Sequence, residues 1–230
     1  MSDRLSVTVD GTAVEVPPGS TVLQAARAAG HPVPVLCFDD RLTPFGACRV
    51  CLVGVEGRDG GMDVIASCTT PARDGMVVHT REDRARRVAA AVVELVLSEL
   101  PTPPAPHTEL AAVAREFDLE PGALRWTGEQ RAVRHDTRHP YLALQHELCI
   151  SCGRCVRACD EIQGTFALTA VGRGFHAGIA AGIDEGFRDS ACVSCGACAD
   201  TCPTDAITEL SLLDLATERA QAAAPNGAPA

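Results

Sequence analysis

The sequence contains no lysine, and aromatic residues make up only 3% of its 230 positions. All twenty basic residues are arginines, and they face thirty acidic residues, which gives a formal net charge of −10 at pH 7. This charge argues against nucleic acid as a partner, because phosphates would be repelled. The scarcity of aromatic side chains also argues against a base-stacking surface or an aromatic-lined ligand pocket.

The chain also lacks a run of eighteen uncharged apolar residues, so we expect no membrane span. Its start, residues 1–10, alternates like a strand and has no apolar signal-peptide region, which indicates a cytoplasmic protein. There is no Walker loop and no CxxCH haem motif, and the stretch from Gly172 to Gly178 does not match GxGxxG. These absences leave no sign of substrate chemistry carried out by the chain alone.

Cysteine is abundant, with twelve residues. A reducing cytosol disfavours disulfides, and the tight CxxC steps suit metal. The strongest pattern is a repeat, residues 149–159 and 192–202, each with four cysteines at gaps of two, two and three residues. In such runs the fourth cysteine binds the other cluster. This predicts two [4Fe–4S] clusters, one bound by Cys149, Cys152, Cys155 and Cys202, and one bound by Cys159, Cys192, Cys195 and Cys198.

The remaining four cysteines, Cys37, Cys48, Cys51 and Cys68, are spaced for a [2Fe–2S] cluster. The first gap of ten residues is wider than in plant-type ferredoxins. The small pair Gly46-Ala47 would let the backbone approach inorganic sulfide. A structural zinc ion bound by four thiolates is the alternative for all three sets of cysteines. It competes more closely with an iron–sulfur cluster at this set than at the other two.

Local patterns predict an α+β protein. We expect strands at 5–9, 13–16 and 76–79, a hairpin turn at Asp10-Gly11 and a helix at 22–29. A helix is expected at 80–100, with a capping box at Thr80–Asp83 and one apolar face formed by Val88, Val92, Leu95, Val96 and Leu100. A proline-rich break and a short helix at 108–117 follow, and three histidines, His135, His139 and His146, are expected at the surface. The predicted domains are 1–80, a connector at 81–140, 141–210, and a C-terminal helix with a disordered tail at 211–230.

A family resemblance extends over residues 4–210. It is carried by four motifs: Leu36-Cys-Phe, Gly46-Ala-Cys-Arg-Val-Cys51, Ala66-Ser-Cys-Thr-Thr-Pro71 and Arg157-Ala-Cys-Asp-Glu-Ile-Gln-Gly164. The chain resembles the N-terminal region of the complex I large iron–sulfur subunit, NAD-reducing hydrogenase diaphorase subunits and NAD-dependent formate dehydrogenase alpha subunits. The resemblance implies an N-terminal β-grasp [2Fe–2S] domain, a helical connector and a C-terminal 2[4Fe–4S] ferredoxin domain.

Two departures from that family stand out. The family carries a further [4Fe–4S] cluster bound by one His and three Cys, but here the corresponding stretch has His107 and no cysteine lies between Cys68 and Cys149. This cluster should be absent and His107 solvated or capping. The chain also ends where a formate dehydrogenase would continue into its molybdopterin domain.

The resemblance implies an electron-relay subunit, without catalysis of its own. It would connect a catalytic subunit, molybdenum formate dehydrogenase or hydrogenase, to a flavin- and NAD-binding diaphorase subunit. The acidic pair Asp160-Glu161, which follows the candidate ligand Cys159, would tune cluster charge or face a partner. A redox-sensing or assembly protein with structural clusters is the alternative. Which route electrons take without the histidine-ligated cluster stays open.

Overall fold

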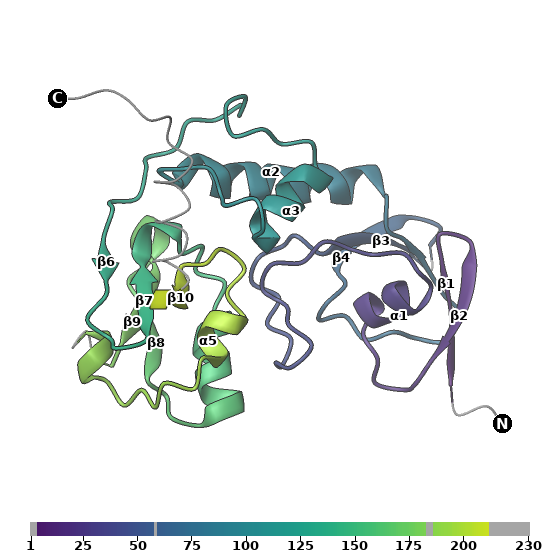
Figure 1. Cartoon of the computed structure of the whole chain (residues 1–230). Coiled ribbons are helices and arrows are strands. Elements are labelled where there is room, and N and C mark those ends of the chain that lie inside the picture. The colour runs from purple at the N-terminus through teal and green to yellow at the C-terminus, as the bar shows by residue number, and fades with distance from the viewer. Residues whose placement is uncertain (1–3, 58, 183–185, 212–230) are drawn as a thin grey trace. The chain divides into compact units, whose positions relative to one another are not determined.

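The computed structural model describes residues 4–57, 59–182 and 186–211, which form two compact units that divide between Gln130 and Arg131 (Figure 1). The helices of the predicted connector therefore belong to the first unit. The predicted C-terminal helix and tail lie outside the described residues beyond Ser211. In the part of the chain that is described, no helix is long and apolar enough to cross a membrane.

The first unit is built on a five-stranded sheet in the order β2-β1-β5-β3-β4. The pairing of β1 with β5 is parallel and the other pairings are antiparallel. The Asp10-Gly11 turn has positive φ at both residues, which confirms the predicted hairpin. The β3–β4 hairpin was not predicted, because Gly54 weakens the strand pattern of β3. The strands are β1 Leu5–Val9, β2 Thr12–Val16, β3 Leu52–Glu56, β4 Met62–Ala66 and β5 Met76–His79.

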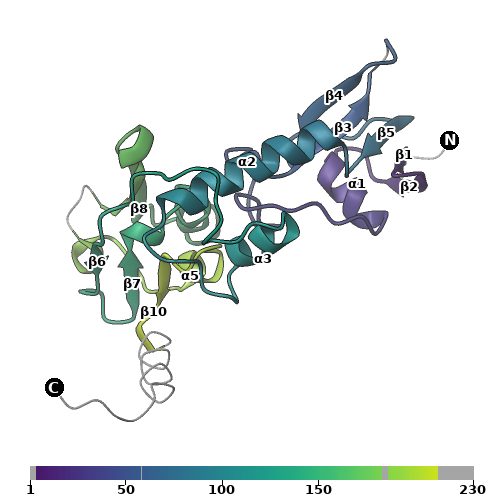
Figure 2. The ribbon, with the colours of Figure 1, turned by 90° about the horizontal axis from the view of Figure 1, so that it is seen from above.

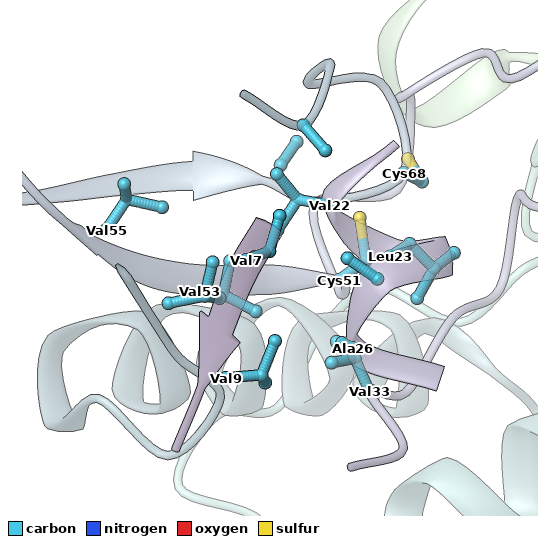
Figure 3. Close-up of a cluster of buried hydrophobic side chains, with 14 of the residues drawn as sticks. Val7, Val9, Val22, Leu23, Ala26, Val33, Cys51, Val53, Val55 and Cys68 are labelled. Carbon is cyan, nitrogen blue, oxygen red and sulfur yellow. The ribbon is translucent and has the colours of Figure 1, made fainter. Parts of the chain in front are cut away.

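Helix α1 (Val22–Ala28) packs on this sheet as predicted. Thr21 caps it in a capping box with Gln24, and Gly30 takes a positive φ beyond its end. Its buried side chains join valines of β1 and β3 in one apolar core, and Cys51 and Cys68 lie in the same cluster (Figure 3). The core of the unit thus extends directly to two of the candidate ligands.

Helix α2 (Asp83–Glu99) forms where predicted, but its cap and its buried face differ from the prediction. Glu82 caps it by accepting from Ala85 N, while Thr80 donates to Asp10 on the sheet, so the predicted capping box is wrong. Val88 and Leu95 are exposed, and the buried stripe consists of Ala85, Ala89, Val93 and Leu97. The start of α2 approaches β3 closely, since a Cβ on Gly54 would lie 2.7 Å from the side chain of the cap residue Glu82, and the first buried residues of the helix are the small Ala85 and Ala89. Figure 2 shows α2 running along β3 and β4.

Helix α3 (Glu109–Glu116) forms where a short helix was predicted, is capped by Thr108 and packs on α2. The chain after α3 is held by a buried acid, Glu94 of α2, which is 1% exposed. Glu94 accepts hydrogen bonds from the backbone N–H and from Nε of Arg125, and its Oε2 lies 2.6 Å from Arg125 Nη2. Glu94 therefore anchors the chain that follows α3 to α2 through Arg125.

Glu94→Gln should destabilise the first unit at neutral pH, because the amide cannot satisfy the same donors. We expect a loss of about 1 kcal/mol, roughly 2–4 °C in Tm. Hydrogen bonds from Arg125 lower the pKa of Glu94. The stabilisation is therefore complete above the unfolded-state pKa and disappears as pH falls through the lower folded-state pKa. Melting wild type and variant in parallel from pH 7 down to about pH 2 tests this, because the gap in Tm should close only below the ordinary pKa of a glutamate; a Tm gap that widens in acid would contradict it.

The second unit combines a three-stranded antiparallel sheet, in the order β10-β7-β6, with the hairpin β8–β9. Its helices are single turns at the cysteine motifs, and a π-helical turn η2 follows the first of them. The architecture confirms the α+β class. The elements are β6 His135–Asp136, β7 Leu142–Gln145, η1 His146–Leu148, α4 Arg154–Arg157, η2 Ala158–Gln163, β8 Leu168–Val171, η3 Gly174–His176, β9 Gly178–Ala181, η4 Phe187–Asp189, α5 Ala197–Asp200 and β10 Ile207–Glu209.

Candidate metal centres

The first unit brings together the thiols of Cys37, Cys48, Cys51 and Cys68. Cys37 lies within hydrogen-bonding reach of Cys48 and Cys68, and Cys51 within reach of Cys68. Cys48 N also points at Cys37 Sγ at 3.5 Å. Cys48 is half-buried and the other three are buried. Four soft sulfur donors converge here, which fits a [2Fe–2S] cluster.

Secondary structure fixes these thiols from two sides. Cys51 directly precedes β3, and the segment after β4 that carries Cys68 is tied to it by Ser67, whose N and Oγ both donate to Cys51 O. The first amides of α1 donate to the same segment, Leu23 N to Ser67 O at 3.0 Å. Gly46 has φ +71° and an added Cβ would lie 3.0 Å from the Thr69 side chain, so glycine is required there.

Hydrogen bonds between the four thiols lower the pKa of two of them and raise the pKa of the other two. Cys37 accepts from Cys48 and Cys68, which lowers the pKa of Cys37, and Cys51 accepts from Cys68, which lowers its pKa to about 7. The pKa values of Cys48 and Cys68 are raised, first by these contacts and then by burial. Two thiols are thus poised to release their protons to a metal, as ligation requires.

The second unit groups the other eight cysteines into two cavities. One is lined by Cys149, Cys152, Cys155 and Cys202 together with aliphatic residues of β7, β9 and β10. The other is lined by Cys159, Cys192, Cys195 and Cys198 together with Leu142, Leu168 and Phe187. Each cavity therefore takes three thiols from one repeat and one from the other. Four thiols in an apolar wall fit a [4Fe–4S] cluster; among the described residues, no group of three or more His, Cys, Asp or Glu could hold a single metal ion.

The two repeats share one backbone conformation. Ser151 and Ser194 both have positive φ, and each donates its N–H to the first sulfur of its repeat, Cys149 or Cys192, at 3.4 Å. Gly153 and Gly196, the next residues with positive φ, begin α4 and α5. These turns wrap the chain around each cavity and aim backbone amides at sulfur, an arrangement that stabilises negative charge on a cluster.

The repeat extends further than the cysteine spacing indicated. Thr165-Phe-Ala-Leu168 after Cys159 matches Thr204-Asp-Ala-Ile207 after Cys202. Both threonine hydroxyls lie near the preceding sulfur, at 3.2 Å and 3.7 Å. Sequence reasoning missed this match because η2 inserts extra residues before Thr165, although aligning the halves would have revealed it.

Burial distinguishes the two cavities. It raises the pKa of Cys152 to about 12 and that of Cys155 well above its ordinary value. Cys195, which is equivalent to Cys152, is the one exposed cysteine of the twelve. Tyr141 and Val193, beside it, are 65% and 54% exposed. The second set therefore reaches solvent at Cys195, whereas burial raises the pKa of its Cys198 to about 12, as it does for Cys152 of the first set.

Two charged or titratable side chains near these cavities could not be identified from the sequence. Arg154 is buried and its Nε donates to Thr201 Oγ1 at 3.0 Å, which places a cation beside the cysteine motifs. His139 is 3% exposed, so the prediction that it lies at the surface is wrong; it packs against Phe187. His135 and His107 are exposed as predicted, and so are Asp160 and Glu161.

Two family models match the chain. Residues 2–83 match the 2Fe-2S iron-sulfur cluster binding domain, and residues 148–206 match the 4Fe-4S dicluster domain. These matches coincide with the first five-stranded unit and with the two cavities of the second.

Related proteins extend over nearly the whole chain. The NADP-reducing hydrogenase subunit HndD of Solidesulfovibrio fructosivorans is 34% identical over 89% of this chain and 36% of its own length. The NADH-quinone oxidoreductase subunit 3 of Thermus thermophilus is 33% identical over 89% of this chain and 30% of its own length. The chain thus spans about a third of these curated relatives. A crystal structure of NAD+-reducing [NiFe]-hydrogenase in the H2-reduced state contains a chain that is 30% identical, with a TM-score of 0.78, covering 98% of this chain and 90% of that one.

Proposed function

Since the chain belongs to the family of iron–sulfur subunits found in NAD(P)-reducing hydrogenases and NADH-quinone oxidoreductases, we propose that it relays electrons within a cytoplasmic, NAD-linked oxidoreductase complex. The observation that carries this proposal is the grouping of all twelve cysteines into three sets of four. Each cluster, when bound, exchanges one electron.

We assign the ligands set by set. Cys37, Cys48, Cys51 and Cys68 hold the [2Fe–2S] cluster. Cys149, Cys152, Cys155 and Cys202 hold the first [4Fe–4S] cluster, and Cys159, Cys192, Cys195 and Cys198 hold the second. The shared exchange of Cys159 and Cys202 supports the two [4Fe–4S] clusters being neighbours, because each repeat contributes to both cavities.

The partners we propose are a catalytic subunit, of hydrogenase or molybdenum formate dehydrogenase type, and a flavin- and NAD-binding subunit. The solvent-facing second cavity supports electron exchange with one of them around Cys195. A groove there of about 490 Å³ is lined by Tyr141, Leu210 and Glu209. A cluster ligand at the surface supports this, because it shortens the distance over which an electron must tunnel to a partner.

Iron and acid-labile sulfide analysis of the anaerobically purified chain should give about ten irons, two from the [2Fe–2S] cluster and four from each [4Fe–4S] cluster. Potentiometric EPR titration should show reversible reduction at all three. About fourteen irons would mean that a further cluster is present after all. Clusters that cannot be reduced reversibly would favour a structural or sensing protein, and stoichiometric zinc would overturn the assignment.

A further inference from the structure

Of the seven histidines, all of which the structure describes, only His139 is buried. It lies between β6 and β7, with its ring 4.8 Å from that of Phe187, a residue that lines the second cysteine cavity. His139 is not among the candidate ligands, so its two ring nitrogens are available for hydrogen bonds near the second cysteine cavity.

Hydrogen bonding fixes the tautomer of this ring. Nδ1 lies 3.0 Å from Leu142 N and 3.2 Å from Tyr141 N, so it accepts from two backbone amides and carries no proton. Burial lowers the pKa of His139, which keeps the ring neutral. The single ring proton is therefore on Nε2, which lies 3.4 Å from Ser194 Oγ. His139 donates to Ser194 and does not accept from it.

Ser151, the equivalent serine of the first repeat, donates its hydroxyl hydrogen bond, whereas Ser194 accepts one. Ser151 Oγ lies 3.0 Å from Ala177 O, and since a carbonyl can only accept, the hydroxyl proton of Ser151 is used there. Ser194 Oγ instead faces the donor Nε2 of His139, so the hydroxyl proton of Ser194 is not used in that contact and can be directed toward the cysteine side. Both serines otherwise match, with N–H to Sγ distances of 3.4 Å. The two cysteine loops thus differ in one hydrogen-bond direction.

We propose that His139 is a positioning residue for the second [4Fe–4S] cluster, and that by donating to Ser194 it turns the Ser194 hydroxyl toward the cluster and raises the reduction potential of that cluster alone. The inference rests on the proposed function. Added donors near cluster sulfur stabilise the extra electron of the reduced state, which is why the potential rises.

Two conservative variants separate the two nitrogens. His139→Asn keeps an acceptor near the Nδ1 position, preserving the turn into β7, but cannot reach Ser194. His139→Gln places an amide donor near the Nε2 position. Ser194→Ala removes the hydroxyl itself, and Ser151→Ala is the matched control in the first repeat. All are measured in the full chain with its clusters, by EPR-monitored potentiometric titration.

Ser194→Ala should move one [4Fe–4S] transition, which identifies the second cluster, whereas Ser151→Ala should move neither, because the hydroxyl proton of Ser151 is held by Ala177 O. We expect His139→Asn to move only the transition that Ser194→Ala moves, to a more negative potential. The ratio of reduced to oxidised cluster at a fixed potential should fall about threefold to tenfold, where tenfold corresponds to about 59 mV for one electron. His139→Gln should shift it less, and His139→Asn should add nothing to Ser194→Ala.

The inference is overturned if His139→Asn, with its iron content intact, moves neither transition or moves both equally. If His139→Asn loses the cluster, His139→Gln and Ser194→Ala decide: unchanged potentials in both would also overturn it. A wild-type chain without reversible transitions would instead refute the electron-relay proposal, so the two failures are distinguishable.

Discussion

Replacing Cys202 by alanine should remove the [4Fe–4S] cluster of the first repeat, although Cys202 belongs to the second. The reason is the crossed lining of the cavities, in which Cys202 joins Cys149, Cys152 and Cys155. The iron content should fall by about four per chain, since a cubane with three protein thiolates in an otherwise apolar cavity is not retained. Iron analysis and the loss of one [4Fe–4S] EPR signal measure this effect.

Double variants make the test decisive. Cys149→Ala with Cys202→Ala should lose no more iron than either single change, because both residues serve one cluster. Cys192→Ala with Cys202→Ala should lose about eight irons, because these residues serve different clusters. An uncrossed arrangement predicts the reverse pattern. Cys68→Ala is the matched control: it should cost only the two irons of the [2Fe–2S] cluster and leave both [4Fe–4S] signals unchanged.

The second large effect is a difference in oxidative lability between the two [4Fe–4S] clusters. Cys195 is exposed, whereas its counterpart Cys152 is buried. Oxidants and chelators reach an exposed cluster directly but reach an enclosed one only after the fold opens. We expect the second cluster to be lost about tenfold faster or more under limited air or ferricyanide, because local opening of roughly 1.4 kcal/mol already accounts for a factor of ten.

Single-cluster variants provide the measurement. Cys202→Ala leaves the second [4Fe–4S] cluster and Cys159→Ala leaves the first. The loss of the [4Fe–4S] EPR signal, read in reduced aliquots, therefore reports one [4Fe–4S] cluster in each variant and leaves out the [2Fe–2S] cluster that both keep. Comparable decay in both, or faster decay in Cys159→Ala, would show that the exposure of Cys195 does not govern access. Wild-type protein, which should decay in two phases, guards against effects of the substitutions themselves.

Much of this site was predictable because cluster ligation is written in short-range spacing. Three cysteines at gaps of two residues must lie on one loop, and the loop conformation follows from the residues between them, such as Ser151 and Gly153 with their positive φ. The hairpin at Asp10-Gly11 and the Thr21 cap are local in the same way. Local signals of this kind need no knowledge of what packs against them.

The errors arose where packing decided the outcome. The apolar residues of α2 allowed two faces, and packing against the sheet and α3 buried the one that contains Ala85 and Ala89. Thr80 could cap a helix, but Asp10 of the sheet lies within reach and takes its hydroxyl. Each choice depends on a residue far away in the sequence.

By itself, the sequence determined the number and spacing of the twelve cysteines, from which three clusters are predicted, and it contains no cysteine between Cys68 and Cys149, since residue identity and spacing are covalent properties of the chain. Only the tertiary structure decided that the cavity of Cys195 opens to solvent, and that a buried histidine stands behind Ser194. Burial and hydrogen-bond direction depend on which distant segments cover each loop, and two nearly identical repeats received different neighbours.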